Sequence, residues 1–141
     1  MTAAPFDAAD PAAYRVWTEE RTRFGDLDAF GHINNNAINI YFEGARVAVC
    51  EAAGFRMGGG QGIAAVRLLF EYKAELHHPS TVRIGSRTLH VGRSSFSVAQ
   101  GLFLGDRLCA TSEAVMVMID LEARGAAPLP AAMRAALEAL A

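Results

Sequence analysis

One long amphipathic helix is the feature that most limits how this chain can fold. From Ala37 to Ala53, apolar residues recur at spacings of three and four, which is typical of a helix with one buried face. Gly54 follows the last periodic residue and is a suitable helix stop. The apolar face comprises Ile38, Tyr41, Phe42, Ala45, Ala48, Val49 and Ala52.

The segments around this helix have the pattern of strands. From Ile63 to Leu76 the residues alternate, which predicts a long half-buried strand that ends at His77, His78 and Pro79. Further strands are predicted at 14–24, 82–91, 96–104 and 108–121, separated by turn signals. The order is one strand, the helix, and then four strands connected as a meander. This order indicates an α+β fold.

A dense group of polar residues directly precedes the helix. The stretch 24–36 holds two carboxylates, one imidazole and three carboxamides. One of Asn34, Asn35 or Asn36 is suited to cap the helix. The unpaired N–H groups and positive dipole end of a helix N-terminus suit a developing oxyanion. Asp and Asn are also common in turns and caps, so a structural role for each residue stays open.

The residues of this stretch carry a family resemblance. The motif Phe-Gly-Asp-x-Asp-x-x-Gly-His-Ile-Asn-Asn at 24–35, with Tyr-Phe-Glu-x-Ala-Arg at 41–46, resembles the 4-hydroxybenzoyl-CoA thioesterase-like branch of the hotdog-fold thioesterases. The resemblance covers about residues 15–122. It implies a hotdog fold, in which a five-stranded antiparallel sheet wraps around one long central helix. It also implies a homodimer at least, with a homotetramer open, and an active site built from both chains.

The activity that the resemblance implies is hydrolysis of an acyl-CoA thioester to free acid and CoA. The family's catalytic carboxylate corresponds to Asp28, as general base or nucleophile, while Asp26 would hold the turn. The resemblance places the oxyanion donor at the backbone N–H of about Asn35. His32 and Asn34 lie near enough in sequence to orient water or the thioester, and a structural role for His32 is equally open. No cofactor is expected, because CoA is part of the substrate.

Other positions bear on substrate binding. The family often has Tyr where this chain has Ile38, and an aliphatic acyl group fits Ile38 at least as well as an aromatic one. The turn Arg93-Ser94-Ser95 resembles the family segment that runs beside pantetheine and reaches the CoA phosphates. The same residues are also ordinary hairpin composition. Arg83 and Arg87 are weaker candidates for CoA binding.

Several other residues have plainer interpretations. Glu43 and Arg46 are expected to form a salt bridge on the polar stripe of the helix. Cys50 and Cys109 are expected to be buried small hydrophobes. No metal site is predicted, since His77 and His78 cannot both face one metal from an extended chain. The glycine-rich segment 58–62 is expected to be a plain linker, with a flexible lid or the edge of a substrate pocket as alternatives.

Composition and length bound the remaining possibilities. The 141 residues are 52% hydrophobic with a net charge of −2, enough for one core and without a basic footprint for nucleic acid. The chain start has no secretory pattern, and no apolar stretch is long enough for a bilayer, so we expect a cytoplasmic protein without a membrane partner. We assign 1–13 to an N-terminal segment, 14–125 to the hotdog domain, and 126–141 to a C-terminal helix packed on it.

Two alternative functions remain open at this stage. A hotdog hydratase or dehydratase also pairs Asp with His, usually with another spacing and without the Asn-Asn entry to the helix. A non-catalytic acyl-CoA-binding protein would ordinarily bring a DNA-binding segment or a second domain. This chain is too short and too acidic for either addition.

Overall fold

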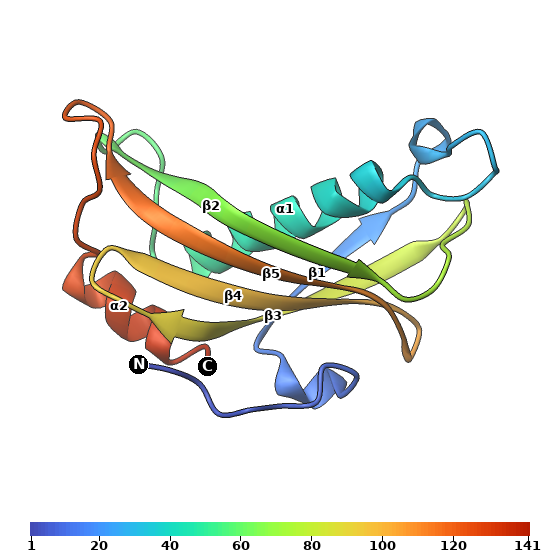
Figure 1. Cartoon of the computed structure of the whole chain (residues 1–141), viewed down its shortest axis with the longest axis horizontal. Helices are drawn as coiled ribbons and strands as arrows, with labels where there is room; N and C mark the ends of the chain where they lie inside the picture. The colour runs from blue at the N-terminus through green and yellow to red at the C-terminus, as the bar shows by residue number, and fades with distance from the viewer.

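A curved antiparallel sheet wraps around one long helix, as a computed structural model describing all residues 1–141 shows (Figure 1). The expected hotdog arrangement is confirmed. The helices are α1 (Asn35–Ala52) and α2 (Ala131–Glu138), with short 3₁₀ turns at Pro11–Ala13 and Phe24–Asp26. The strands are β1 (Val16–Arg21), β2 (Gln61–Tyr72), β3 (Thr81–Val91), β4 (Ser95–Leu104) and β5 (Arg107–Asp120).

The connectivity of the sheet differs from the predicted meander. The strand order is β1-β3-β4-β5-β2, so only β3, β4 and β5 follow one another as neighbours. The strand after the helix, β2, pairs with β5 at one edge, whereas β1 pairs with β3 at the other edge. The meander prediction was therefore wrong for β2. It assumed that strands adjacent in sequence pair, whereas β4 and β5 lie between β2 and β3 in the sheet.

Helix α1 begins at Asn35, two residues before the predicted start, because the side chain of Asn34 caps it. Asn34 Oδ1 accepts a hydrogen bond from the N–H of Asn36 at 2.8 Å. At the other end, Gly54 has φ of +89°, and its N–H bonds the carbonyl of Glu51 while the N–H of Phe55 bonds that of Cys50. This is the pattern of a Schellman motif, which requires a residue that tolerates positive φ.

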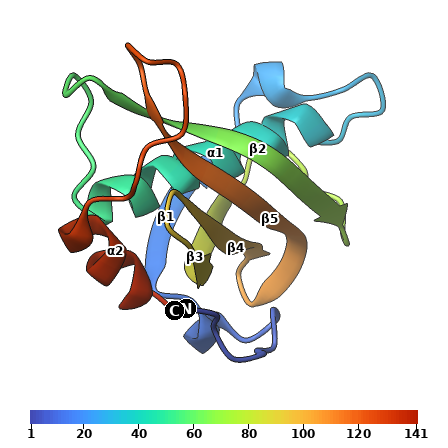
Figure 2. The same ribbon diagram turned by 60° about the vertical axis from the view of Figure 1, so that its left-hand side comes forward.

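The core beneath α1 is divided into two apolar parts. One lies toward the start of the helix and includes Tyr41, Phe42 and Leu102, and the other includes Val49 and Phe96. The second part also takes in Met133 and Leu137 of α2, which packs at the C-terminal end of α1 (Figure 2). Along α1, β3, β4 and β5, buried polar residues lie between the residues of the two apolar parts, and four of them pair across these elements. We call them the polar row: Arg46 of α1, Ser86 of β3, Gln100 of β4 and Ser112 of β5.

Strand β2 is the least buried strand of the sheet. Val66, Leu68, Leu69 and Tyr72 are between 40% and 62% exposed, and a β-bulge interrupts the pairing with β5 between Ala65 and Arg67. The prediction of a half-buried strand was wrong here, because an edge strand with a bulge has no sheet neighbour on one side. Its exposed apolar residues form a surface that a monomer leaves open to water.

The face of the sheet opposite α1 is covered by aromatic residues. Tyr14 is buried, donates a hydrogen bond to the carbonyl of Ala8 at 2.7 Å, and packs edge-on against Trp17 and Phe103. Burial raises the pKa of its hydroxyl to about 12, with a smaller contribution from Asp7. The Tyr14 ring lies so close to the sheet that a Cβ on Gly101 would be 2.5 Å from its hydroxyl oxygen.

Two glycine-to-alanine substitutions should therefore act in opposite directions. We expect Gly101→Ala to lower the free energy of unfolding by about 1–3 kcal/mol, because the new methyl group collides with Tyr14. Gly44 is exposed to solvent and lies within α1 away from its ends, where an added Cβ would meet only Glu20 Oε1 at 3.7 Å. Gly44→Ala should therefore raise the free energy of unfolding by about 0.5–1 kcal/mol. Urea unfolding of both variants checks this. A Gly101→Ala variant as stable as the parent would show that Tyr14 is not fixed against the sheet.

Candidate active site

The loop before α1 holds Asp28 in a tight turn. Asp28 Oδ1 accepts hydrogen bonds from the N–H groups of Phe30 at 2.9 Å and His32 at 3.1 Å. The backbone closes the same turn, since the Asp28 N–H bonds the carbonyl of His32 at 2.9 Å, and Gly31 supplies a φ of +80°. These bonds engage one carboxylate oxygen. The other oxygen has no hydrogen-bond partner in the chain, and the residue is half-buried.

Asp26 joins this loop to the helix. Its Oδ2 accepts hydrogen bonds from the Arg23 N–H at 2.9 Å and from the Tyr41 hydroxyl, and its carbonyl accepts one from the Asn34 N–H at 2.8 Å. Tyr41 is fully buried, and burial, followed by the bond to Asp26, raises the pKa of its hydroxyl. Asp26 thus holds the turn as expected, and its carboxylate is occupied by structural bonds.

The N-terminus of α1 leaves backbone donors free beside this loop. The N–H groups of Asn35 and Ala37 have no hydrogen-bond partner within the chain. The Asn34 side chain is used as the cap, so its oxygen is not available to orient a substrate. The positive end of the helix dipole adds to the attraction that these two N–H groups exert on an anion.

Four of the predicted site residues meet in one cleft. Asp28, His32, Asn35 and Ile38 line a space of about 280 Å³ that the segment 72–76 closes on the other side. We call it the Asp28 cleft. Its remaining lining residues are Ile33, Tyr72, Lys73, Ala74, Glu75 and Leu76.

His32 is held at the rim of this cleft by an acidic partner. Its Nε2 lies 3.2 Å from Glu75 Oε2, and its ring lies edge-on to that of His77. Sequence reasoning did not connect these residues, because His32 precedes α1 and Glu75 follows β2, and the two segments meet only in the folded chain, where the Ile33 N–H bonds the carbonyl of Leu76. The contact orients the imidazole at the rim of the cleft.

The predicted CoA-binding turn lies elsewhere in the same chain. Arg93, Ser94 and Ser95 form the β3–β4 turn, at the α2 end of the sheet and away from the loop that holds Asp28 (Figure 1). The carbonyl of Arg93 accepts hydrogen bonds from the Leu129 N–H at 2.8 Å and the Arg134 guanidinium at 3.1 Å. The C-terminal segment therefore fixes this turn. Within one chain, the structure does not bring it to the Asp28 cleft.

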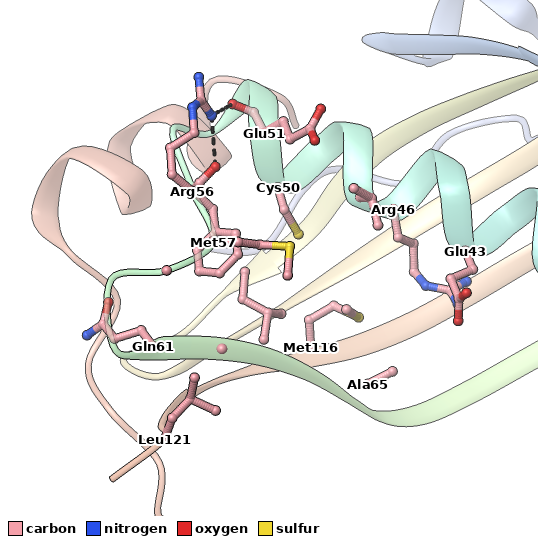
Figure 3. A pocket seen from close by; sticks show the side chains of 15 residues that line it. Glu43, Arg46, Cys50, Glu51, Arg56, Met57, Gln61, Ala65, Met116 and Leu121 are labelled. Carbon is pink, nitrogen blue, oxygen red and sulfur yellow. Dashed lines mark hydrogen bonds between the residues drawn. The ribbon is translucent and has the colours of Figure 1, made fainter.

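A second, larger cavity lies between the C-terminal half of α1 and the start of β2 (Figure 3). Its volume is about 880 Å³, and the glycine-rich segment after the helix borders it through Gly58 and Gly62. We call it the larger cavity. The other lining residues are Glu43, Arg46, Val47, Cys50, Glu51, Phe55, Arg56, Met57, Gln61, Ile63, Ala65, Met116 and Leu121. Among the interpretations of segment 58–62, the pocket edge is the one that this geometry fits.

Sequence reasoning missed the larger cavity, although the helix carried a signal. Arg46 interrupts the apolar face of α1, and it is only 5% exposed, whereas Glu43 three residues earlier is exposed. The expected salt bridge between Glu43 and Arg46 does not form, because the arginine points under the helix into the core and hydrogen-bonds Gln100 instead. That prediction was wrong.

Cys50 and Cys109 are buried and free, as expected, and burial raises the pKa of the Cys50 thiol to about 11.

Comparison with known proteins places this geometry in a family. The profile described as the thioesterase-like superfamily matches residues 22–137. The chain therefore belongs to the thioesterase-like superfamily. The match includes the loop with Asp28, helix α1 and all strands from β2 to β5.

Individual relatives agree with this assignment. The structure of PA5185 from Pseudomonas aeruginosa strain PAO1 is similar with a TM-score of 0.85 and 28% identity, over 92% of this chain and 94% of that one. A thioesterase superfamily protein from Jannaschia sp. CCS1 is similar with a TM-score of 0.84 and 27% identity, over 92% and 85% of the two chains. The YsmA protein of Bacillus subtilis (strain 168) is 28% identical over 115 residues, covering 78% of this chain and 76% of YsmA.

No helix of the structure combines the length and the apolar character needed to cross a membrane.

Metal binding needs a separate test, because the structure assembles a set of possible ligands that the sequence did not suggest. The possible ligand atoms of His32, Glu75 and His77 all lie within 4.8 Å of one another. The prediction of no metal considered only His77 and His78, which cannot both face one ion.

We still expect that this protein holds no metal. Glu75 and His77 are exposed, His32 is half-buried, and Glu75 is already paired with His32, so a zinc ion would have to gather two water-exposed ligands with little support around them. Thermal unfolding should then show the same midpoint with added ZnCl₂ as with EDTA. A midpoint that rises with zinc in the parent chain, and does not rise in His77→Ala, would contradict the expectation.

Proposed function

We propose that this protein is a thioesterase that hydrolyses acyl-CoA to the free acid and CoA. One observation carries the proposal. The Asp28 cleft presents a carboxylate oxygen without a partner and, from the start of α1, the unpaired N–H of Asn35. These are the two groups that thioester hydrolysis requires, a base or nucleophile and a preorganised donor for the oxyanion. Membership of the thioesterase-like superfamily supports the same reaction class.

The chemistry follows from this arrangement. The thioester oxygen would lie at the Asn35 N–H, where the helix dipole stabilises the charge that develops on it. Asp28 then takes a proton from a water molecule that attacks the carbonyl carbon, or attacks that carbon itself to give a mixed anhydride that water hydrolyses. In both routes the C–S bond breaks and CoA leaves as a thiol after protonation. Ile38 forms an apolar wall next to the acyl group.

The Asp28 turn is well built to keep its shape during this reaction. Both N–H bonds from Phe30 and His32 go to Oδ1, so the free oxygen is held in one direction by the backbone. The contact between His32 Nε2 and Glu75 Oε2 helps to position the neighbouring imidazole. Positioning of this kind lowers the entropic part of the barrier.

Replacement of Asp28 is the direct test. In Asp28→Asn the amide oxygen still accepts both N–H bonds, so the fold should persist while the base or nucleophile is lost. We expect kcat for acyl-CoA to fall by about 10²–10⁴-fold with an unchanged thermal midpoint. Free-thiol release from short, medium, long and aryl acyl-CoAs measures this. The control is Asp106→Asn, an exposed charge at the β4–β5 turn.

The outcomes of this test separate the proposed function from its alternatives. Full activity in Asp28→Asn would remove Asp28 from the mechanism and leave the reaction to another group. Acyl-CoA binding without thiol release in the parent chain would favour a binding protein. Conversion of an enoyl-CoA or a 3-hydroxyacyl-CoA would favour a hydratase or dehydratase.

We also propose that the working unit is at least a homodimer, formed by pairing of β2 with its copy. The exposed apolar residues and free edge of β2 support this arrangement. A second copy would also supply the Arg93–Ser95 turn, which one chain holds at the wrong end of the sheet, to the CoA part of the substrate. Ser hydroxyls and the Arg guanidinium suit pantetheine amides and phosphates.

A charge on the proposed interface should separate the copies. We expect Leu68→Lys to shift the chain from dimer or larger toward monomer, because an ammonium would be buried against the apolar edge of the partner. Light scattering coupled to size exclusion measures the mass. Thr81→Lys, an exposed position on the opposite side of the sheet next to β1, should leave the mass unchanged. A monomeric parent chain would refute the dimer.

A further inference from the structure

Arg46 is a buried cation without an anionic partner. It is 5% exposed, lies near the middle of α1 and contributes to the polar row between the two parts of the core. Its one hydrogen bond runs from Nη1 to Gln100 Oε1 at 3.4 Å. No carboxylate lies within ion-pair distance of it. Burial lowers the pKa of the guanidinium, and the more distant Glu43 opposes this. An arginine side chain is charged in proteins at neutral pH.

The surroundings of Arg46 leave most of its donors unused. A guanidinium carries five N–H donors, and Gln100 offers only the oxygen of its amide. Gln100 is fixed by its own bonds, since its amide nitrogen donates to the carbonyl of Phe42 and to Ser86 Oγ, each at 3.1 Å. The fully buried polar atoms without a partner do not include those of Arg46, so its free N–H groups keep some access to solvent at the cavity that Arg46 lines. A charge that is only 5% exposed and has one protein partner still costs free energy.

The larger cavity is where the unused donors can be satisfied. Arg46 lines it, and Figure 3 shows the side chain running from α1 toward the strands below. Most of the other lining is apolar, including Val47, Ile63 and Met116. The other arginine of the lining, Arg56, already donates to the carbonyls of Glu51 and Phe55 at 3.1 and 2.8 Å. A ligand that enters therefore meets an apolar wall and one desolvated cation.

We propose that Arg46 binds a carboxylate at the far end of the acyl group, so that the preferred substrates are CoA thioesters of dicarboxylic acids. This inference rests on the proposed thioesterase function. The methylene chain would lie along the apolar wall, and the terminal carboxylate would pair with the guanidinium, whose forked donors match two oxygens. A carboxylate offers more to a desolvated cation than a hydroxyl or a keto oxygen, because it also neutralises the charge.

The position of the cavity suits a site shared by two copies. Within one chain, Arg46 lies eleven residues after Asn35 on α1, about 16 Å along the axis. The Phe42–Phe70 stack and the bond from the Tyr72 hydroxyl to Asn39 lie between the two cavities. In the proposed dimer, antiparallel pairing of β2 places the start of one strand beside the end of the other. The larger cavity of one copy then lies next to the Asp28 cleft of the other.

Matched substrates test the inference. We expect the full chain to hydrolyse adipyl-CoA with kcat/KM at least about tenfold above that for hexanoyl-CoA, which has the same chain length without the carboxylate. Arg46→Met should remove this preference mainly by lowering kcat/KM for adipyl-CoA, while hexanoyl-CoA turnover stays within a few-fold. Arg46→Lys should keep part of the preference. Glutaryl-CoA with pentanoyl-CoA, and suberyl-CoA with octanoyl-CoA, define the best length.

Glu43 provides an opposing control in the same cavity. Its carboxylate should repel a dicarboxylic substrate, so Glu43→Gln should raise the preference for adipyl-CoA over hexanoyl-CoA. A general loosening of the cavity would change both variants in one direction. Opposite shifts in Arg46→Met and Glu43→Gln would support recognition of charge.

Binding of the free acids tests the inference without catalysis. Adipate should raise the thermal midpoint of the parent chain more than hexanoate does, and Arg46→Met should abolish the difference. If no thioester is hydrolysed, the proposed function fails and this binding comparison decides on Arg46 alone. If hexanoyl-CoA is hydrolysed as well as adipyl-CoA, or the preference survives in Arg46→Met, the inference is refuted and the thioesterase proposal stands.

Discussion

The packing of α1 toward one side of the sheet determines where every other functional feature lies. The helix contacts β1, β3 and β4 closely and leaves a gap on the side of β2. The Asp28 cleft and the larger cavity both lie in this gap, at the two ends of α1. The free donors at the helix start face the first of them because Asp26 ties the preceding loop to Tyr41 and Asn34. Attachment of the loop to the helix in this way keeps the N–H donors at the start of α1 in a fixed position relative to Asp28.

The polar row gives the core two different ends. Toward the start of α1 the apolar part surrounds Tyr41 and Phe42, close to the candidate chemistry, and toward its end the apolar part extends to α2. Between them, the Ser112 hydroxyl is buried without a partner, and Arg46 has a single bond. Unsatisfied groups in the middle of a core reduce stability. Arg46, unlike Ser112, lines the larger cavity, where a ligand of the kind proposed would offset that cost.

Much of the fold could be predicted from local patterns. The helix was located within two residues because its periodicity is strong and because Asn34 and Gly54 are good end signals. Most predicted strand bounds lie close to the observed ones, because the strands alternate and turn residues separate them. The place of β2 at the sheet edge was not predictable in this way, because pairing with β5 depends on contacts between residues far apart in sequence. Its alternation looked like that of a half-buried strand, yet the bulge after Ala65 and the free edge expose it.

The candidate site was predictable only where one short segment forms it. Asp28, His32 and Asn35 are neighbours in sequence, and the structure keeps them together in one cleft. Glu75 reaches His32 from the chain after β2, and nothing in the sequence around either residue reports that contact. Arg46 was misread for a related reason. Spacing along the helix paired it with Glu43, whereas its actual neighbour, Gln100, is set by the register of β4 beneath the helix.

The bulge in β2 has a consequence for how the chain behaves at low concentration. An apolar sheet edge can pair with almost any extended strand, which is a hazard for aggregation. A bulge breaks the regular ladder, so that only a strand with a compatible irregularity can pair along the full length. In the proposed dimer, the same edge that would attract unrelated strands is thereby selective for its own copy. Dilution below the dissociation constant of that pairing would expose the edge again, so the free edge would be available to unrelated strands only in the dilute, monomeric chain.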